Sequence, residues 1–161
     1  MRTPLVTRQG YNALRDELDH LWRVERPETT KKVTWAASLG DRSENADYQY
    51  NKKKLREIDR RVRYLRKALE RLKVVDYDPV QEEKVLFGAW CKIEREDGKE
   101  LTVRVVGYDE IFDRKDYISV DSPMARALVG KMIDDEVVVK TEAATAYWTI
   151  VDIWYETPNS D

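Results

Sequence analysis

Two long helical patterns meet at the stretch Leu39-Gly40-Asp41-Arg42-Ser43-Glu44-Asn45-Ala46-Asp47-Tyr48. Gly40 suits the left-handed position that ends a helix, and the spacing from Asp41 to Glu44 predicts a capping box that opens the next helix. A turn between two helices needs only such a stop and such a start. With Asp47 the stretch holds three carboxylates, so we expect the tip of a hairpin with more acidic groups than the turn requires.

The segment before this tip carries one apolar stripe. Thr7 is the expected N-cap, and apolar residues then recur at three- and four-residue spacing: Tyr11, Leu14, Leu18 and Leu21. Pro27 lacks an N–H and its ring crowds the preceding turn, so we expect it to kink or break this helix. Trp35 lies among polar residues, and we expect it to pack across the helix pair.

The segment after the tip has the strongest structural pattern in the chain. From Leu55 onward its apolar residues keep the alternating spacing of a coiled-coil seam: Tyr48, Leu55, Ile58, Val62, Leu65, Leu69 and Leu72. Two helices joined by a short turn bury their stripes against each other, which predicts an antiparallel hairpin. A helix of about 30 residues is roughly 45 Å long, so the hairpin should project as a rod.

Basic residues crowd the second helix between Lys52 and Lys67, where only Glu57 and Asp59 oppose them. They are Lys52, Lys53, Lys54, Arg56, Arg60, Arg61, Arg63, Arg66 and Lys67. A charged helix face is usually just solvated when both signs alternate. Here one sign dominates, and like charges four residues apart destabilise a helix, so a polyanion is the natural partner. The nearby tyrosines, Tyr48, Tyr50 and Tyr64, could stack on bases or pack against the first helix.

Charge divides the chain into unlike halves. Residues 1–79 hold 19 Lys and Arg against 13 Asp and Glu, a net +6, whereas residues 80–161 hold 10 against 18, a net −8. This asymmetry and the helix stop at Pro79 predict two domains. We expect a coiled-coil hairpin domain at 1–76, with its acidic tip at 40–47, and a second domain at 80–158.

The second half changes from a helical to a strand period. The expected strands cover 85–93, 101–106, 117–120, 135–139 and 146–154, with a hairpin turn at Asp97-Gly98 and a short helix at 122–130 that has a serine cap, a first-turn proline and a closing glycine. This predicts a small antiparallel sheet with one helix, and for the whole chain an α+β fold in two domains.

Several kinds of site are excluded by composition. The chain has one cysteine and one histidine, too few for a disulfide framework or a zinc site, and it shows no phosphate-binding loop or nucleophilic triad. Cys91 is expected in a strand core and His20 on a solvated face. No apolar run approaches the roughly 20 residues of a membrane span, and the first residues lack a signal core, so we expect a soluble cytoplasmic protein.

The tip carboxylates remain as the candidates for acid–base or metal chemistry. Asp41 and Glu44 could be a capping box and nothing more, an interpretation that their spacing alone favours. Alternatively, they could be delivered into the site of another molecule. Two carboxylates alone bind Mg²⁺ poorly, but together with ligands from a partner they could hold the second ion of a two-metal phosphodiester hydrolysis.

Two long motifs resemble those of the bacterial Gre transcript-cleavage factors. The first is Gly40-Asp41-Arg42-Ser43-Glu44-Asn45-Ala46-Asp47-Tyr48, and the second is Asp121-Ser122-Pro123-Met124-Ala125-Arg126-Ala127-Leu128. The resemblance runs from Thr3 to the final strand. Within the family, Trp35-Ala36-Ala37-Ser38-Leu39-Gly40 and the segment from Tyr48 to Arg61 are similar to the GreB subtype rather than GreA.

The resemblance implies a transcription elongation factor rather than an enzyme. It implies an FKBP-like second domain that binds bacterial RNA polymerase through Asp121, Ser122 and Pro123, and a coiled coil that enters the secondary channel. Asp41 and Glu44 match the acidic tip pair, the catalytic residues that share Mg²⁺ with the polymerase and stimulate its own cleavage of backtracked RNA. The basic helix matches the patch for the RNA 3′ segment, which implies RNA binding by Lys52, Lys53, Arg56, Arg60 and Arg61.

The sequence also bears on other partners and functions. DNA would be met only indirectly, through the elongation complex, and we expect a monomer that holds no metal tightly by itself. The main alternative is a regulator that occupies the secondary channel and inhibits or modulates polymerase without cleavage, although a plug needs no carboxylates at its tip. A chaperone or prolyl isomerase would leave the long basic coiled coil unexplained.

Overall fold

The computed structural model describes residues 2–40, 44–78 and 83–156. Its contacts divide the chain into two compact units, Tyr11–Leu72 and Met1–Gly10 together with Lys73–Asp161. The expected domain at 1–76 therefore includes two short segments, residues 1–10 and 73–76, that the contacts assign to the second unit. The reason is a non-local strand pair: β1 (Leu5–Thr7) and β2 (Lys73–Val75) run parallel, with Val6 opposite Val74. Sequence periodicity did not predict either of these three-residue strands.

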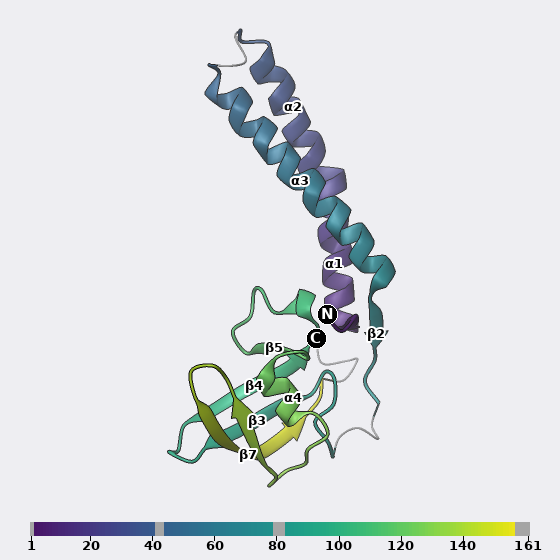
Figure 1. Ribbon diagram of the computed structural model, residues 1–161. Helices are drawn as coiled ribbons and strands as arrows, with labels where there is room; N and C mark the ends of the chain where they lie inside the picture. Colours follow the sequence, from purple (N-terminus) through teal and green to yellow (C-terminus); the bar gives the residue numbers. More distant parts are fainter. Residues whose placement is uncertain (1, 41–43, 79–82, 157–161) are drawn as a thin grey trace. The chain divides into compact units, whose positions relative to one another are not determined.

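The first arm of the hairpin is helical throughout. It consists of α1 (Arg8–His20), a π-helical turn η1 (Leu21–Glu25) and α2 (Arg26–Ala37) (Figure 1). Thr7 caps α1 as predicted, since the Gly10 N–H donates to Thr7 Oγ1 at 3.0 Å. Pro27 was expected to kink this helix or break it into two pieces, and the α-helical hydrogen-bond pattern does change directly before it: Pro27 lies in the first turn of α2, after the π turn that separates α2 from α1. The wider π turn, with the Arg26 N–H bonded to the Leu21 carbonyl oxygen, precedes it.

The second arm is the single helix α3 (Ala46–Arg71), which lies beside α2 and runs in the opposite direction (Figure 1). The predicted seam is confirmed, since Ile58, Val62 and Leu65 are at most 5% exposed. The expectation for Trp35 is wrong: its side chain is 56% exposed. The adjacent Ala36 occupies the buried position instead, which turns Trp35 outward by about 100° around α2.

The second unit contains a five-stranded sheet in the order β5-β4-β3-β7-β6. Its strands are β3 (Trp90–Arg95), β4 (Glu100–Val106), β5 (Tyr117–Ser119), β6 (Glu136–Lys140) and β7 (Thr145–Trp154). Neighbours pair antiparallel except β4 and β5, which are parallel. The expected purely antiparallel sheet is corrected at this edge, because a connection with a 3₁₀ turn (Tyr108–Glu110) returns the chain in the direction of β4.

The expected strand at 85–93 begins later than predicted. β3 starts at Trp90, and Gly88 has a φ of +90°, a backbone conformation typical of glycine in a turn. Val85 meanwhile donates its N–H to the Lys131 carbonyl oxygen rather than to a strand. The apolar run is thus half loop and half strand, although both halves supply buried side chains.

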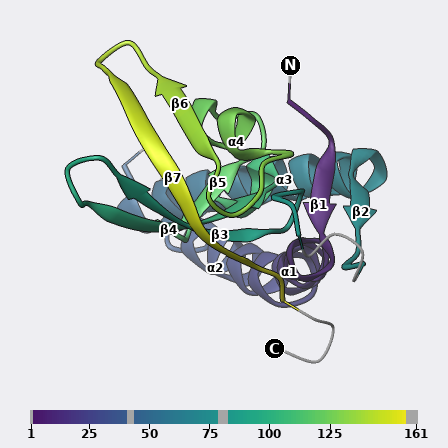
Figure 2. The same ribbon diagram turned by 90° about the horizontal axis from the view of Figure 1, so that it is seen from below.

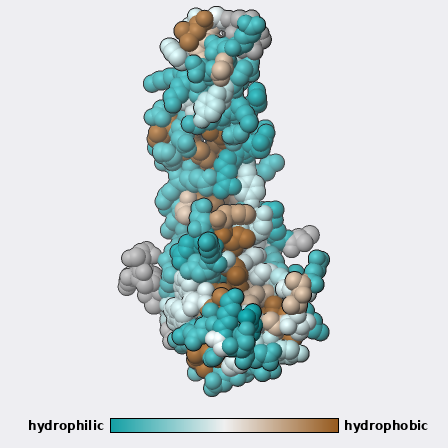
Figure 3. Space-filling model, turned by 90° about the vertical axis from the view of Figure 1, so that its left-hand side faces the viewer, coloured by the Kyte–Doolittle hydropathy of each residue, from teal (hydrophilic) through white to brown (hydrophobic). Residues whose placement is uncertain are grey.

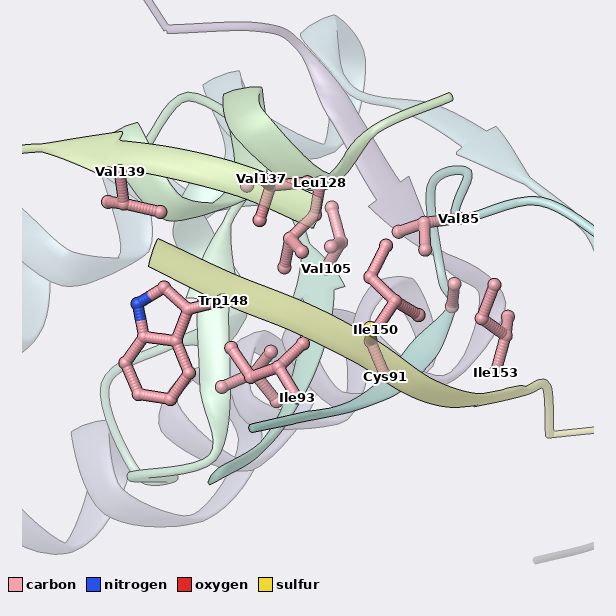
Figure 4. Packing of buried hydrophobic residues seen from close by; sticks show 13 residues of the cluster. Val85, Cys91, Ile93, Val105, Leu128, Val137, Val139, Trp148, Ile150 and Ile153 are labelled. Carbon is pink, nitrogen blue, oxygen red and sulfur yellow. The ribbon is translucent and has the colours of Figure 1, made fainter. Parts of the chain in front are cut away.

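The core of this unit lies between the sheet and α4 (Pro123–Leu128), the predicted short helix, which packs beside β5 and β6 (Figure 2). The fully buried residues from strands, helix and loop include Val85, Cys91, Ile93, Val105, Leu128 and Ile150 (Figure 4). Cys91 is a core residue as predicted, and burial raises the pKa of its thiol to about 12. In the described part of the chain, no helix is long and apolar enough to cross a membrane.

Candidate functional site

The tip of the hairpin is built around Asn45. Asn45 is the N-cap of α3: its Oδ1 accepts the Tyr48 N–H at 3.0 Å, and its Nδ2 donates to the Ala36 carbonyl oxygen at 2.6 Å. The predicted capping box from Asp41 to Glu44 is therefore wrong for this helix, because α3 starts after Glu44. Gly40, with a φ of +129°, has the glycine-type conformation expected after the first arm.

Of the two predicted catalytic and metal residues, Glu44 is exposed, and Asp41 lies outside the described residues. Glu44 precedes α3 and therefore lies outside the helix that its carboxylate was expected to cap. Asp47, also exposed, lies in the first turn of α3, where a negative charge is favourable beside the N-terminus. Asp47 therefore has a local structural role in α3.

The carboxylate oxygens of the tip are donors of the kind that a hard divalent cation prefers. Carboxylate oxygens are ligands of Mg²⁺, which takes six ligands and is usually held by only one or two carboxylates. Among the residues described, no group of three or more His, Cys, Asp or Glu side chains could hold a metal ion. Asp41 and Glu44 could thus contribute to a Mg²⁺ site whose other ligands come from elsewhere.

The predicted RNA-binding residues do not all share one face of α3. Lys53, Arg56 and Arg60 are exposed, and Lys52 donates through Nζ to the Tyr48 hydroxyl at 2.9 Å. Arg61 lies nine residues beyond Lys52, which is two and a half turns and hence the opposite side of the helix. The structure therefore separates Arg61 from Lys52 and Arg56.

Arg61 joins the two arms of the hairpin. Its guanidinium makes two hydrogen bonds to the Glu17 carboxylate, at 2.7 and 2.9 Å. Paired guanidinium–carboxylate bonds of this kind have well-defined geometry. This arrangement gives Arg61 a structural role between α1 and α3, which the spacing of basic residues did not predict.

The predicted polymerase-binding residues lie at the start of α4. Ser122 is its N-cap, with Oγ accepting the Ala125 N–H at 3.2 Å, and Pro123 is exposed in the first turn. Asp121 accepts hydrogen bonds from the Thr3 N–H, at 2.7 Å, and from Thr3 Oγ1. These hydrogen bonds from Thr3 lower the pKa of the Asp121 carboxyl. The segment is therefore held in place by both the helix cap and the N-terminal strand region.

Residue-level reasoning missed Asn45 and Thr3 as positioning residues. Asn45 could have been found, because asparagine is among the preferred N-cap residues and directly precedes the helical pattern. Thr3 could not, because its partner is 118 residues away.

The Gre-like motifs predicted a helical hairpin with exposed acidic and basic residues, followed by a small α+β unit. The structure has this arrangement, and comparison with protein families defines the class as transcription elongation factors. Residues 4–74 match the family described as "Transcription elongation factor, N-terminal", and residues 80–155 match "Transcription elongation factor, GreA/GreB, C-term". The chain belongs to the GreA/GreB family of transcription elongation factors.

The relatives share nearly the full length of the chain. Transcription elongation factor GreB of Pseudomonas putida is 65% identical over 155 residues, covering 96% of both chains. GreB of Vibrio cholerae is 60% identical over 157 residues, covering 97% of this chain and 98% of its own. The solved structure of the GreA factor homolog 1 (Gfh1) protein of Thermus thermophilus is 25% identical, with coverages of 95% and 99% and a TM-score of 0.43. A superposition at that score is too loose to support an argument, so the assignment rests on sequence.

Proposed function

We propose that this elongation factor binds bacterial RNA polymerase, inserts its hairpin through the secondary channel and stimulates the polymerase's own cleavage of backtracked RNA. The observation that carries the proposal is the exposed carboxylate of Glu44 at the hairpin tip, in a chain 65% identical to a GreB. A side chain that protrudes beyond its helix can enter the site of another molecule. The protein would then act in the cytoplasm as an accessory factor, not as an enzyme in its own right.

The tip would complete a metal site rather than form one. Asp41 and Glu44 would hold Mg²⁺ jointly with ligands of the polymerase, since two carboxylates leave most of the coordination shell open. Bound there, Mg²⁺ would stabilise developing negative charge and help to activate water for phosphodiester hydrolysis. The Asn45 hydrogen bonds to Tyr48 and Ala36 would position the Glu44 backbone from both arms of the hairpin.

The two other predicted surfaces would bind different partners, one the polymerase and the other the RNA. The start of α4, at Asp121, Ser122 and Pro123, would dock on polymerase. Lys52, Lys53, Arg56 and Arg60 would contact the backbone of the RNA 3′ segment, while Arg61 would act mainly by holding α3 against α1. DNA would be reached only through the elongation complex, and the factor would work as a monomer.

A cleavage assay on backtracked elongation complexes tests the role of the tip. Glu44→Gln and Asp41→Asn should each lower the rate of stimulated cleavage by roughly a hundredfold, which corresponds to about 2.7 kcal/mol in the barrier, without weakening polymerase binding. Asp47→Asn is the matched control, because it removes a carboxylate of the same tip that belongs to the first turn of α3; it should retain cleavage. Retained cleavage in Glu44→Gln would contradict the proposal.

If the protein is instead a channel regulator that does not stimulate cleavage, we expect a different result for the tip variants. A plug would inhibit RNA synthesis equally well with Gln at position 44, because occlusion requires bulk rather than charge. Wild-type inhibition without cleavage, unchanged by the tip variants, would therefore establish that alternative.

A further inference from the structure

Trp22 lies in a shallow basic hollow of the hairpin that neither the tip nor the docking segment uses. The hollow has a volume of about 240 Å³ and is open to solvent. One residue of α3 and five residues of the first arm line it: Arg66, and Arg15, Leu18, Asp19, Trp22 and Arg23. Trp22 belongs to the π-helical turn, an irregularity that often occurs at functional sites, and is 45% exposed.

The hollow combines an aromatic ring with an excess of positive charge. The guanidinium groups of Arg66 and Arg26 lie 4.5 and 5.2 Å from the centroid of the Trp22 ring. Arg23 and Arg15 add two further cations, and Arg15 Nε lies 3.7 Å from Asp16 Oδ1. Asp19 is the one acid in the lining, and Arg23 Nε lies 2.7 Å from its Oδ1. An anion that entered the hollow would thus meet a net positive site in which the carboxylate is already neutralised.

This hollow continues the basic face of α3. At about 100° per residue, Lys52, Arg56, Arg63 and Arg66 fall within about 80° of one another around the helix. Asp59 lies on the same side, but it binds Arg26, whose Nε is 2.8 Å from its Oδ1. Hydrophilic residues dominate the hairpin face seen in Figure 3, with small hydrophobic areas between them. Cations therefore follow one side of α3 for roughly 20 Å between Lys52 and Arg66, at 1.5 Å per residue.

We infer that the Trp22 hollow binds a base of single-stranded RNA, with Arg66 and Arg15 contacting the adjoining phosphates. Single-stranded nucleic acid is commonly held by a basic track together with aromatic side chains that contact its bases. The continuity with the basic side of α3 favours RNA over an acidic protein segment, which would gain little from an indole. The inference extends the proposed function, on which it rests for the identity of the ligand, by giving the RNA 3′ segment a second contact far from the tip.

RNA binding by the full chain in the absence of polymerase tests this inference. The probe is a fluorescently labelled oligouridine of about ten nucleotides, within the range of single-strand site sizes. Trp22→Leu should weaken binding at least about fivefold, the lower end of what one base–aromatic contact contributes, and Arg66→Gln should weaken binding as well. Trp35→Leu is the matched control, because Trp35 is a second exposed tryptophan of the hairpin that does not line the hollow; it should leave the affinity unchanged.

The affinity for an abasic strand of the same length distinguishes a contact with a base from a contact with the phosphates. Trp22→Leu should have no effect on its affinity, whereas Arg66→Gln should weaken it. Unchanged oligouridine binding by Trp22→Leu, or an equal loss with the abasic strand, would overturn the inference, and far-UV circular dichroism checks that each variant is folded. Weakened binding of polyglutamate with RNA binding intact would instead assign the hollow to an acidic protein segment.

These results are independent of the cleavage assay. Loss of cleavage in Glu44→Gln with normal RNA binding by Trp22→Leu would uphold the proposed function and refute only the Trp22 contact. Retained cleavage in Glu44→Gln with weakened RNA binding by Trp22→Leu would do the reverse.

Discussion

Asn45 Nδ2 lies 2.6 Å from the carbonyl oxygen of Ala36, so the residue that caps α3 also binds the C-terminal end of α2. One side chain thereby satisfies a backbone donor of one helix and a backbone acceptor of the other. The two arms of the hairpin are tied at the point where the chain enters the candidate site.

Replacing Asn45 should loosen the tip. Asn45→Ala removes both hydrogen bonds, and the loss of an N-cap typically costs about 1 kcal/mol; urea unfolding monitored by circular dichroism would measure the change. Asn45→Asp is the matched control, because it keeps an acceptor for the Tyr48 N–H but cannot donate to Ala36. If the Ala36 bond matters, Asn45→Asp should show faster amide hydrogen exchange near Gly40 while α3 remains capped. Equal exchange in wild type and Asn45→Asp would assign the role to capping alone.

The pair between Arg61 and Glu17 should contribute to stability rather than to RNA binding. In a double-mutant cycle with Arg61→Ala and Glu17→Ala, we expect a coupling free energy of about 0.2 to 1 kcal/mol, the range for exposed ion pairs. Arg61→Ala should therefore unfold at slightly lower urea concentration, while its cleavage of complexes with long RNA 3′ segments remains close to wild type.

Arg56→Ala provides the contrast, because Arg56 is exposed on the basic side of α3. It should reduce cleavage of complexes with long RNA 3′ segments more than those with short ones, and should leave unfolding nearly unchanged. If Arg61→Ala impairs long segments as strongly as Arg56→Ala, the proposed division of roles is wrong.

The thiol of Cys91 should be inert in the folded protein. Burial raises its pKa to about 12, so at pH 8 only about one molecule in ten thousand carries a thiolate, the form that reacts with alkylating agents. Iodoacetamide labelling should follow global unfolding, and should become rapid in concentrated urea, where the pKa returns to about 8.5. Labelling of the native protein at the rate of a free thiol would show that β3 opens locally.

The Asp121 carboxylate should make stability depend on acid pH. Its pKa is lowered by the hydrogen bonds from Thr3, so the folded state favours the ionised form. The stabilisation is complete above the ordinary aspartate pKa of about 4 and is lost as the pH falls through the lower, folded-state pKa. The difference in unfolding free energy between wild type and Asp121→Asn should therefore shrink from about pH 6 to about pH 3. A constant difference across this range would show that ionisation of Asp121 does not contribute.

The hairpin was predictable because its signals are local. The seam through Ile58, Val62 and Leu65 specifies the buried face, and Gly40 specifies where the first arm ends. The precise start of α3 was not predictable from spacing, because Asp41 and Asn45 are both acceptable caps and only tertiary contact with Ala36 distinguishes them. The exposure of Trp35 was missed for a related reason, since hydrophobicity alone does not say which face of α2 meets α3.

The strand pairings of the second unit were harder to predict from the sequence, because they join residues far apart in the chain. The strand periods of 101–106 and 146–154 were sufficient to place β4 and β7, but nothing local indicates that Val6 pairs with Val74 or that β5 runs parallel to β4. At the site, the roles of Asp41 and Glu44 came from resemblance to a family, because their spacing fits a helix cap equally well. The pairing of Arg61 with Glu17, 44 residues apart, depends on the packing of two helices that the sequence does not specify atom by atom.

The π-helical turn at Leu21–Glu25 has a consequence for insertions and deletions in the first arm. A π turn holds about one residue more than an α turn, and one residue corresponds to about 100° of rotation in an α-helix. Deleting a residue within this turn could restore a regular α-helix while keeping Ala36 aimed at α3. The same deletion in the middle of α2 would rotate Ala36 away from the interface with α3. The arm can therefore change its length at Leu21–Glu25 with the least change in the direction of its buried residues.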